Sequence, residues 1–339
     1  MKHGRFCKTE PGGTKIFFEG TATPRNIQAQ IVEKDFWVCW TLKELFQLPV
    51  IGEHLIFKGG TSLSKVFKVI ERFSEDIDVS IDRGFLGFGG TNEPEAGASN
   101  KEKQRSIEAL KVACQQKIAT ELLPALEAVI KSMVRRDEKW SLRSDDDDPD
   151  NQTLLFDYPT SFSPDATSHI RRSVKIEMGA RADHWPCETK TITPFVAEAF
   201  PQGFREASCA VRVLSVERTF WEKATILHAE FHRPPDKAIP DRFSRHYCDF
   251  YDLIRKGVSK SAAAKLELPG ASGRAQSPVF QVVLGQLWRC GQRHVAGRAA
   301  GASIESIAGG LREDAANVLW RTTGLRQNDR HFETMGNRV

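Results

Sequence analysis

The sequence lacks any hydrophobic run long enough to cross a bilayer. No stretch of eighteen apolar residues occurs in the 339-residue chain, and a transmembrane helix needs about that many or more. The N-terminus, MKHGRFCKTEPGG, also lacks the apolar core of a secretory signal. We therefore expect a cytoplasmic protein with no membrane partner.

Paired cysteines are missing as well. The seven cysteines are an odd number, scattered along the chain, and they form no C-x-x-C pair. This argues against a zinc site of the usual spacing and favours reduced thiols over a disulfide framework. The net charge of +4 is mild, so it permits a nucleic-acid partner without arguing for one.

The composition is that of a globular protein, but the two ends differ from the middle. Apolar residues make up 40% and charged residues 27% of the chain, which suits one large domain or two ordinary ones. Residues 1–21 are rich in Gly and Thr, and we expect them to be poorly ordered. Residues 258–339 contain no Tyr and show weak periodicity, so we set them apart as a divergent tail.

Hydrophobic periodicity between these ends predicts a mixture of helices and strands. The predicted helices are residues 24–48 (one helix or two), 62–70, 101–133, 215–228 and 245–255. The predicted strands are residues 55–57, 76–81, 154–156 and 174–178. Residues 83–100 and the acidic run DDDDPD at 145–150 are predicted loops.

The stretch FKGGTSLSKVFKVIERFSEDIDVSI, residues 57–81, carries the clearest chemistry. Glycines let a backbone approach a phosphate closely, and the start of a helix offers free N–H groups. Asp76 and Asp78 would point to the same face of a strand, because side chains alternate with period two. Two such carboxylates suit Mg²⁺, whose coordination is often completed by phosphate oxygens and water. The stretch therefore predicts a turn that holds a triphosphate beside aspartates that hold its metal.

Three further residues are candidates for the same site. Glu177 in VKIEM faces the same side of its strand as Lys175, and it would be a third carboxylate or an exposed strand residue. Lys223 in ERTFWEKA would neutralise phosphate charge or lie along the surface of its helix. Asp249 lies four residues after Arg245 on the same helical face, so the two residues could pair.

These blocks together resemble the AbiEii/AbiGii toxin family, which includes the MenT-type toxins, within the nucleotidyltransferase superfamily. FKGGTSLSK with RFSEDIDVSI, EKDFWVCW, ERTFWEKA and SRHYCDFYDL carry the resemblance, in the order the family has them, over residues 22–256. The resemblance implies a catalytic or nucleotide-binding role for Lys223 and a functional Asp249, with Asp252 and His246 as outside candidates. It also implies that Lys34 and Asp35 support the site. We assign nucleotide binding to Lys58, Gly59, Gly60, Thr61, Ser62 and Lys65, and catalysis to Asp76, Asp78, Glu177, Lys223 and Asp249.

The implied fold is α+β, with a nucleotidyltransferase-like mixed β-sheet, flanking helices and a helical C-terminal lobe. We expect the nucleotidyltransferase domain at residues 22–200 and the lobe at 201–257, with the active site between them. The implied activity is Mg²⁺-dependent transfer of a nucleotide from a nucleoside triphosphate to an acceptor, the 3′ end of tRNA. Such a protein would be the toxin of a toxin–antitoxin or phage-defence pair, with a cognate antitoxin as partner.

Other functions fit the same motifs. A nucleotide-binding regulator without turnover, for example a GTP-binding module, would use the turn and the Asp-x-Asp pair equally well. A transferase that modifies a protein hydroxyl would need the same residues as one that modifies tRNA. An inactive remnant would result if the divergent tail has removed a required part of the helical lobe. Glu177 and Lys223 distinguish these possibilities, because a protein that only binds a nucleotide needs no third carboxylate. A functional role for both residues would favour an enzyme.

Overall fold

The computed structural model describes residues 11–163, 170–181, 185–204, 206–231, 233–234, 237 and 243–265. The chain divides into two compact units, residues 1–216 and 217–339. The sequence places the start of the helical lobe at residue 201. Residues 209–214 lie after that position but form a strand of the sheet in the first unit.

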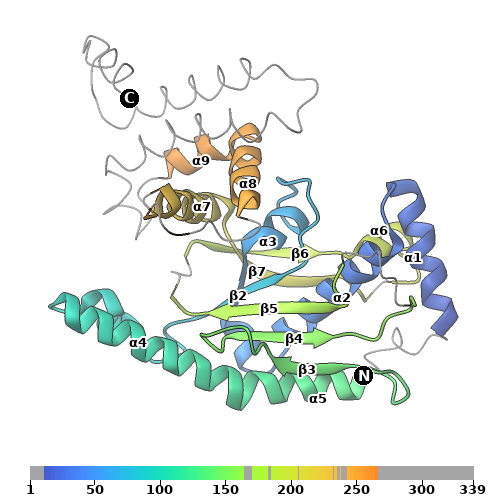
Figure 1. Cartoon of the computed structure of the whole chain (residues 1–339), viewed down its shortest axis with the longest axis horizontal. Helices are drawn as coiled ribbons and strands as arrows, with labels where there is room; N and C mark the ends of the chain where they lie inside the picture. The colour runs from blue at the N-terminus through green and yellow to red at the C-terminus, as the bar shows by residue number, and fades with distance from the viewer. Residues whose placement is uncertain are drawn as a thin grey trace, which may run out of the picture. The chain divides into compact units, whose positions relative to one another are not determined.

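Across the described residues, seven strands form one mixed sheet in the first unit (Figure 1). The strands are β1 (Leu55–Lys58), β2 (Ile77–Ile81), β3 (Ser141–Ser144), β4 (Thr153–Asp157), β5 (Ser173–Gly179), β6 (Cys187–Ile192) and β7 (Cys209–Leu214). Their order across the sheet is β3-β4-β5-β2-β1-β7-β6. β2 is antiparallel to β1 and parallel to β5, and β1 is parallel to β7. The mixed sheet with flanking helices that the sequence predicts is confirmed.

The helices of the first unit follow the predicted pattern in part. They are α1 (Pro11–Arg25), α2 (Ala29–Phe46), α3 (Gly59–Lys65), α4 (Asn100–Lys117), α5 (Leu123–Met133) and the short α6 (Phe195–Ala199). The helix predicted at residues 62–70 spans Gly59–Lys65 instead, so the residues predicted as a turn form its first turn, and the helix Phe195–Ala199 was not predicted. Of residues 1–21, which were expected to be poorly ordered, residues 1–10 lie outside the described residues, and those from Pro11 onward belong to α1. Phe18 and Ala22 are four residues apart on one face of that helix and are buried in the core, so burial orders a segment whose composition suggests disorder.

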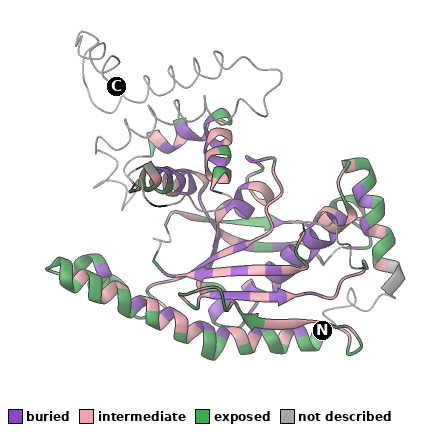
Figure 2. Ribbon diagram, viewed as in Figure 1, coloured by how far each residue is buried: buried purple, intermediate pink, exposed green. Residues whose placement is uncertain are grey.

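A further difference concerns the long helix predicted over residues 101–133. The structure divides it into α4 and α5, joined by a π-helical turn at Ile118–Leu122. Pro124 follows directly, at the start of α5, where a proline is tolerated because the first turn lacks an intrahelical acceptor for its missing N–H. Only Leu110 and Cys114 of α4 are buried, and most of the helix surface is exposed in Figure 2.

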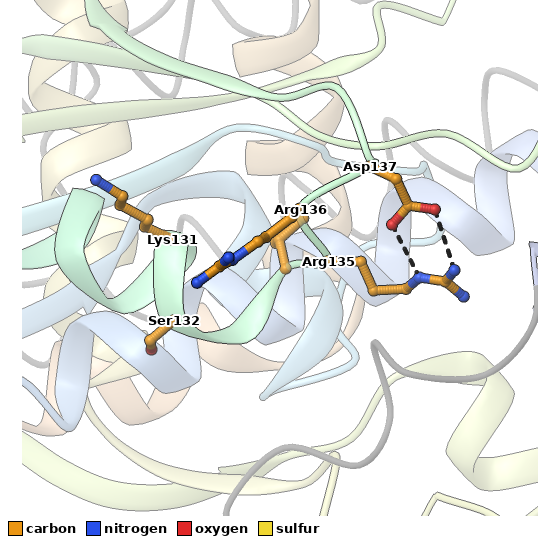
Figure 3. Close-up of a pocket in the computed structure, with 6 residues that line it drawn as sticks. Lys131, Ser132, Arg135, Arg136 and Asp137 are labelled. Carbon is orange, nitrogen blue, oxygen red and sulfur yellow. Dashed lines mark hydrogen bonds and ion pairs between the residues drawn. The ribbon is translucent and has the colours of Figure 1, made fainter.

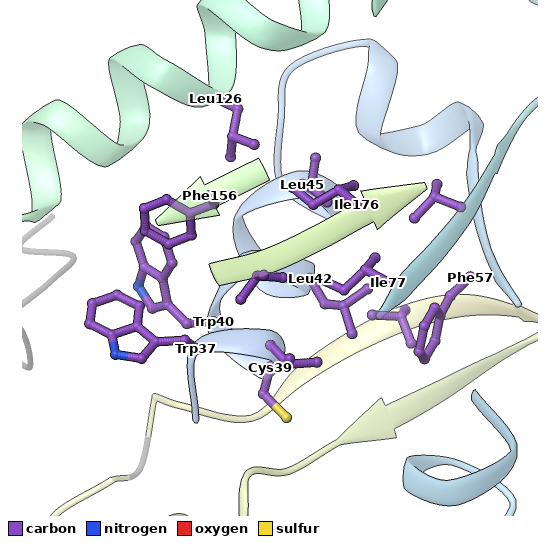
Figure 4. Packing of buried hydrophobic residues seen from close by; sticks show 14 of the residues in the cluster. Trp37, Cys39, Trp40, Leu42, Leu45, Phe57, Ile77, Leu126, Phe156 and Ile176 are labelled. Carbon is purple, nitrogen blue, oxygen red and sulfur yellow. The ribbon is translucent and has the colours of Figure 1, made fainter. Parts of the chain in front are cut away.

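One face of the sheet packs against α2 and carries most of the hydrophobic core. Alternate residues of the central strands point into it, among them Phe57, Ile77 and Ile176, and Figure 4 shows them beside Leu42 and Leu45 of α2. Further buried side chains of the cluster are Val32, Trp37, Cys39, Val79, Leu126, Phe156, Val174 and Met178. Since strand side chains alternate between faces, the residues between these core positions lie on the opposite face of the sheet.

The second unit is helical where the structure describes it. It contains α7 (Val216–Phe231), α8 (Ser244–Arg255) and α9 (Val258–Ala264). Phe220, Ala224 and Leu227, predicted to form the inner face of α7, are all buried, and the ring of Phe220 stacks on Phe250 of α8 at a centroid distance of 4.8 Å. Among the described helices of both units, none combines the length and the apolarity that a bilayer span requires.

Candidate active site

A row of polar residues crosses the centre of the sheet on the face opposite α2. Lys58 of β1 lies beside Asp78 of β2 in the strand register, and Asp78 lies beside Glu177 of β5. Thr153 of β4 continues the row beyond Glu177. Residues that are direct partners across neighbouring strands point to the same face. The register therefore brings together three residues that the sequence assigns to the site from widely separated segments.

Gly59 lies directly against the Asp78 carboxylate. A Cβ atom at Gly59 would lie 1.9 Å from Oδ2 and 2.5 Å from Cγ of Asp78. The backbone φ of Gly59 is +77°, a conformation that glycine adopts without a steric penalty. No other residue type fits here without moving the carboxylate. The position of the Asp78 carboxylate therefore requires glycine at position 59.

The remainder of the turn is held by its own hydrogen bonds. The Thr61 hydroxyl donates to the backbone carbonyl of Asp76 and shares a hydrogen bond of 2.9 Å with the Ser74 hydroxyl. The Ser62 hydroxyl donates to the Gly59 carbonyl at 2.8 Å. Both side chains are fully buried. A Cβ at Gly60 would lie 2.7 Å from the Arg72 guanidinium. These contacts fix the turn against the residues that lead into β2.

The position of Asp78 shifts its ionisation. Burial, followed by the neighbouring Glu177 carboxylate, raises the pKa of Asp78 to about 7, while the Lys58 ammonium opposes the shift. Two adjacent carboxyl groups disfavour each other's charge in this way at many functional sites. A bound cation would relieve this repulsion, so the arrangement has the electrostatic character of a cation site.

The residues fit a magnesium ion through a pair of carboxylates. No group of three or more His, Cys, Asp or Glu side chains is placed to hold a metal ion in the described part of the chain. Mg²⁺ usually binds one or two carboxylates and completes its coordination with substrate phosphates and water. Asp78 and Glu177 supply such a pair of hard oxygen donors. Asp76 directly precedes β2 and contributes to raising the Asp78 pKa.

Lys175 is a residue of this face to which the sequence analysis gave no role. Its Nζ lies 2.7 Å from Glu177 Oε1 and 4.0 Å from Asp145 Oδ2. Although partial burial works against it, the hydrogen bond to Glu177 leaves the pKa of Lys175 above its ordinary value. The sequence indicates this contact, because side chains two residues apart on a strand, such as those of Lys175 and Glu177, point to the same face.

Lys65, predicted to bind nucleotide, forms an ion pair with a carboxylate of α2. Its Nζ lies 2.7 Å from Asp35 Oδ1 of α2 and 3.9 Å from the centre of the Phe195 ring. Asp35 also accepts the backbone N–H of Phe195 at 2.6 Å. Both charged side chains are buried, so the pair fastens the end of α3 to α2 and α6.

Lys34 makes a similar link on the neighbouring side of α2. Its Nζ lies 3.4 Å from Glu75 Oε2 and donates to the backbone carbonyls of Arg171 and Ser173. The lysine thereby joins α2 to the residue before Asp76 and to the start of β5. Lys34 and Asp35 thus hold α2 against neighbouring elements, and a role for them in supporting the site stays a prediction.

Lys223 and Asp249 bind each other within the second unit. Lys223 Nζ donates to Asp249 Oδ2 at 2.8 Å and lies 3.1 Å from His246 Nδ1. The two charged side chains are buried, at 7% and 1% exposure. Asp249 therefore pairs with Lys223, a partner that the sequence analysis did not consider.

A separate hollow at the end of α5 contains none of the predicted site residues. Its lining consists of Lys131, Ser132, Val134, Arg135, Arg136 and Asp137 (Figure 3). The Arg135 guanidinium binds the Asp137 carboxylate through two hydrogen bonds, of 3.1 and 3.0 Å. The charged row on the sheet, rather than this hollow, is thus the candidate active site.

Comparison with known proteins identifies a family and shows similarity to several solved structures. The model of the family described as "Nucleotidyl transferase AbiEii toxin, Type IV TA system" matches residues 40–321. The match extends past residue 257 into the segment expected to diverge, most of which lies outside the described residues. No curated protein matches the chain. MenT4, a nucleotidyltransferase toxin from Mycobacterium tuberculosis, is similar at 14% identity and a TM-score of 0.43, over 90% of this chain and 89% of that one.

Proposed function

The chain belongs to the AbiEii family of nucleotidyl transferase toxins of type IV toxin–antitoxin systems, and we propose that it transfers a nucleoside monophosphate to the 3′ end of tRNA with Mg²⁺. The observation that carries this proposal is the row of Lys58, Asp78 and Glu177 beside the Gly59 turn. A nucleotide-binding regulator has no need of a second carboxylate beside Asp78. The pair therefore favours turnover over binding alone.

The proposed reaction exchanges one bond to phosphorus for another. The 3′ hydroxyl oxygen of the acceptor attacks the α-phosphorus of the triphosphate, the bond from the α-phosphorus to the bridging oxygen breaks, and pyrophosphate leaves. The hydroxyl proton passes to a carboxylate, for which Glu177 and Asp249 are the candidates. A magnesium ion held by Asp78 with Glu177 or Asp76 would neutralise charge on the phosphates.

The chain's cations serve the phosphates in this proposal. Lys58 points to the same face as Asp78, where its charge is available to a phosphate bound beside the carboxylate pair. The backbone at Gly59 and Gly60 carries no side chain, so a phosphate can approach it closely. Lys223 would stabilise the negative charge that develops on the leaving pyrophosphate. In this proposal Lys65 links α3 to α2 through Asp35, whereas Lys223, although Asp249 binds it, keeps the role that the family resemblance implies.

The biological setting follows from the family and from the acceptor. A toxin of this family has a cognate antitoxin and uses a nucleoside triphosphate. Nucleotides added to tRNA 3′ ends would block aminoacylation and arrest growth, and we propose that this arrest serves phage defence. Binding of tRNA would depend on its phosphates and would weaken steeply as salt is raised.

A transfer assay tests the proposal directly. The protein is mixed with Mg²⁺, total tRNA and each labelled nucleoside triphosphate in turn, beside Asp78→Ala and Glu177→Gln variants. Glu188→Gln is the matched control, because Glu188 is also a strand glutamate bound to a lysine two residues away, at 2.9 Å, but on edge strand β6. We expect label on tRNA with the wild type and Glu188→Gln, and none with the two site variants.

The outcomes separate the candidate functions. Label on protein but not on tRNA would indicate that the acceptor is a protein hydroxyl and not tRNA. Triphosphate binding without label on either would support a binding module instead. Equal labelling by Asp78→Ala and the wild type would remove the Asp78–Glu177 row from the mechanism.

A further inference from the structure

Glu177 already has a cationic partner on its own strand. The Lys175 ammonium lies 2.7 Å from Oε1 of Glu177, and it is 35% exposed. It also faces Asp145, at 4.0 Å, in the loop after β3, and its pKa is raised further by Asp76. Glu177 and Asp76, the two carboxylates that act on Asp78, thus act on Lys175 as well. Lys175 is a second cation on this face besides Lys58.

Each carboxylate of the pair has one lysine beside it. Lys58 lies beside Asp78 in the register, and Lys175 binds Glu177. Together they offset the two negative charges that would otherwise repel each other. A carboxylate oxygen that accepts an ammonium hydrogen bond at 2.7 Å is not available to a metal ion at the same lone pair, and like charges of the lysine and the metal repel.

We propose that Lys175 is a positioning residue that acts as an internal counter-cation for Glu177 and competes with the divalent cation for that carboxylate. The inference rests on the proposed function, since it takes Asp78 and Glu177 as the metal-binding pair. In consequence the free protein binds a divalent cation weakly. A triphosphate, with its own negative charge, draws the Lys175 ammonium away and frees Glu177 for the metal that accompanies it.

The test measures metal binding rather than turnover. Mn²⁺ replaces Mg²⁺ so that free ion can be followed by electron paramagnetic resonance in the absence of nucleotide. Lys175→Met removes the competing charge, and we expect its Mn²⁺ affinity to rise roughly tenfold, as for removal of one like charge about 5 Å from a divalent ion in water. Lys175→Arg keeps the charge and should bind Mn²⁺ as the wild type does.

The chain offers a matched control in Lys190→Met. Lys190 lies 2.9 Å from Glu188, two residues away on a strand, as Lys175 does from Glu177, but it lies on edge strand β6. Its removal changes the net charge by the same amount and should leave Mn²⁺ affinity unchanged. Asp78→Asn locates the ion, because Mn²⁺ binding at the proposed pair must weaken in that variant. A thermal melt of each variant establishes that it is folded.

The results distinguish this inference from the proposed function. Unchanged or weaker Mn²⁺ binding by folded Lys175→Met overturns the competition, even where the wild type transfers nucleotides to tRNA. An equal rise in Mn²⁺ affinity for Lys190→Met would show that net charge alone causes the effect, and it would also overturn the proposed competition. Tighter binding by Lys175→Met alone supports the inference, and if the wild type then transferred no nucleotide, only the proposed reaction would fail.

Discussion

The backbone of Gly59 touches the carboxylate of Asp78 so closely that a single added methyl group would lie 1.9 Å from Oδ2. The two residues come from different elements: Gly59 begins α3 and Asp78 is the second residue of β2. Their contact explains why the turn begins with glycine, independently of any phosphate. Glycine is thus required at position 59 for two reasons, the close carboxylate and the positive φ. Substitutions can measure the two effects separately.

Gly59→Ala should destabilise the protein and displace Asp78. The conformational cost at φ +77° is of order 1 kcal/mol, and the clash with the carboxylate adds to it. Gly87→Ala is the matched control, because Gly87 has φ +87° and open space around its Cβ position. We expect a larger loss of unfolding free energy in urea for Gly59→Ala, together with loss of nucleotide transfer.

A double-mutant cycle checks that Asp78 is the cause. In an Asp78→Ala background the carboxylate is absent, so Gly59→Ala should cost less there than in the wild type. Equal costs in the two backgrounds would show that the clash does not contribute.

Asp78→Asn should stabilise the protein at alkaline pH in the presence of a chelator. The folded-state pKa of Asp78 is raised to about 7 from its usual value of 3.8, so the folded state binds a proton more tightly than the unfolded state. Stability from this group is therefore greatest at low pH and falls as pH rises toward 7. We expect an advantage for Asn on the order of 1 kcal/mol or more at about pH 8 and less at about pH 5. An advantage that does not depend on pH would contradict this assignment.

Removal of one partner of the Lys223–Asp249 pair should destabilise the second unit. Each variant leaves the other charge buried without its partner, which typically costs about 3–5 kcal/mol. The double variant Lys223→Met/Asp249→Leu leaves neither charge, so its melting temperature should be nearer that of the wild type. All three variants should lack nucleotide transfer. Transfer by the folded double variant would reduce the pair to a structural role.

Lys65→Met should affect stability and leave triphosphate binding intact. Burial raises the pKa of the Asp35 carboxyl while Lys65 opposes the shift, and the ion pair is almost completely buried. Loss of the lysine should therefore lower stability by about 3 kcal/mol, with partial recovery in Lys65→Met/Asp35→Asn. Calorimetric titration with a triphosphate provides the second readout. Weaker triphosphate binding by the folded variant would restore the nucleotide-binding prediction for Lys65.

Much of the candidate site was accessible from the sequence because its elements have local signatures. Alternation of apolar residues around Asp78 and Glu177 gives both strands and the face on which their carboxylates lie. The Gly59–Gly60 pair marks the turn. The parallel register that places Asp78 beside Glu177 was not accessible, because nothing within either strand specifies its partner across the sheet.

Other features were missed for identifiable reasons. β6 has the sequence CETKTI, and its four central residues are exposed, so it lacks the apolar alternation of a half-buried strand. β7, CAVRVL, does alternate, with Cys209, Val211 and Val213 buried, and this usable signal was overlooked. The Lys65–Asp35 and Lys223–Asp249 pairs join different helices, and their contacts depend on packing that no local pattern encodes.

The order of strands across the sheet has a consequence for synthesis of the chain. β2 follows β1 closely, but β5 and β7, which flank this pair in the sheet, are made much later. Contacts between distant segments form slowly because a long loop must close first. A nascent chain that ends before β5 has Asp78 but not Glu177. The pair of Asp78 and Glu177, on which the proposed reaction depends, is therefore complete only after more than half of the chain has been translated.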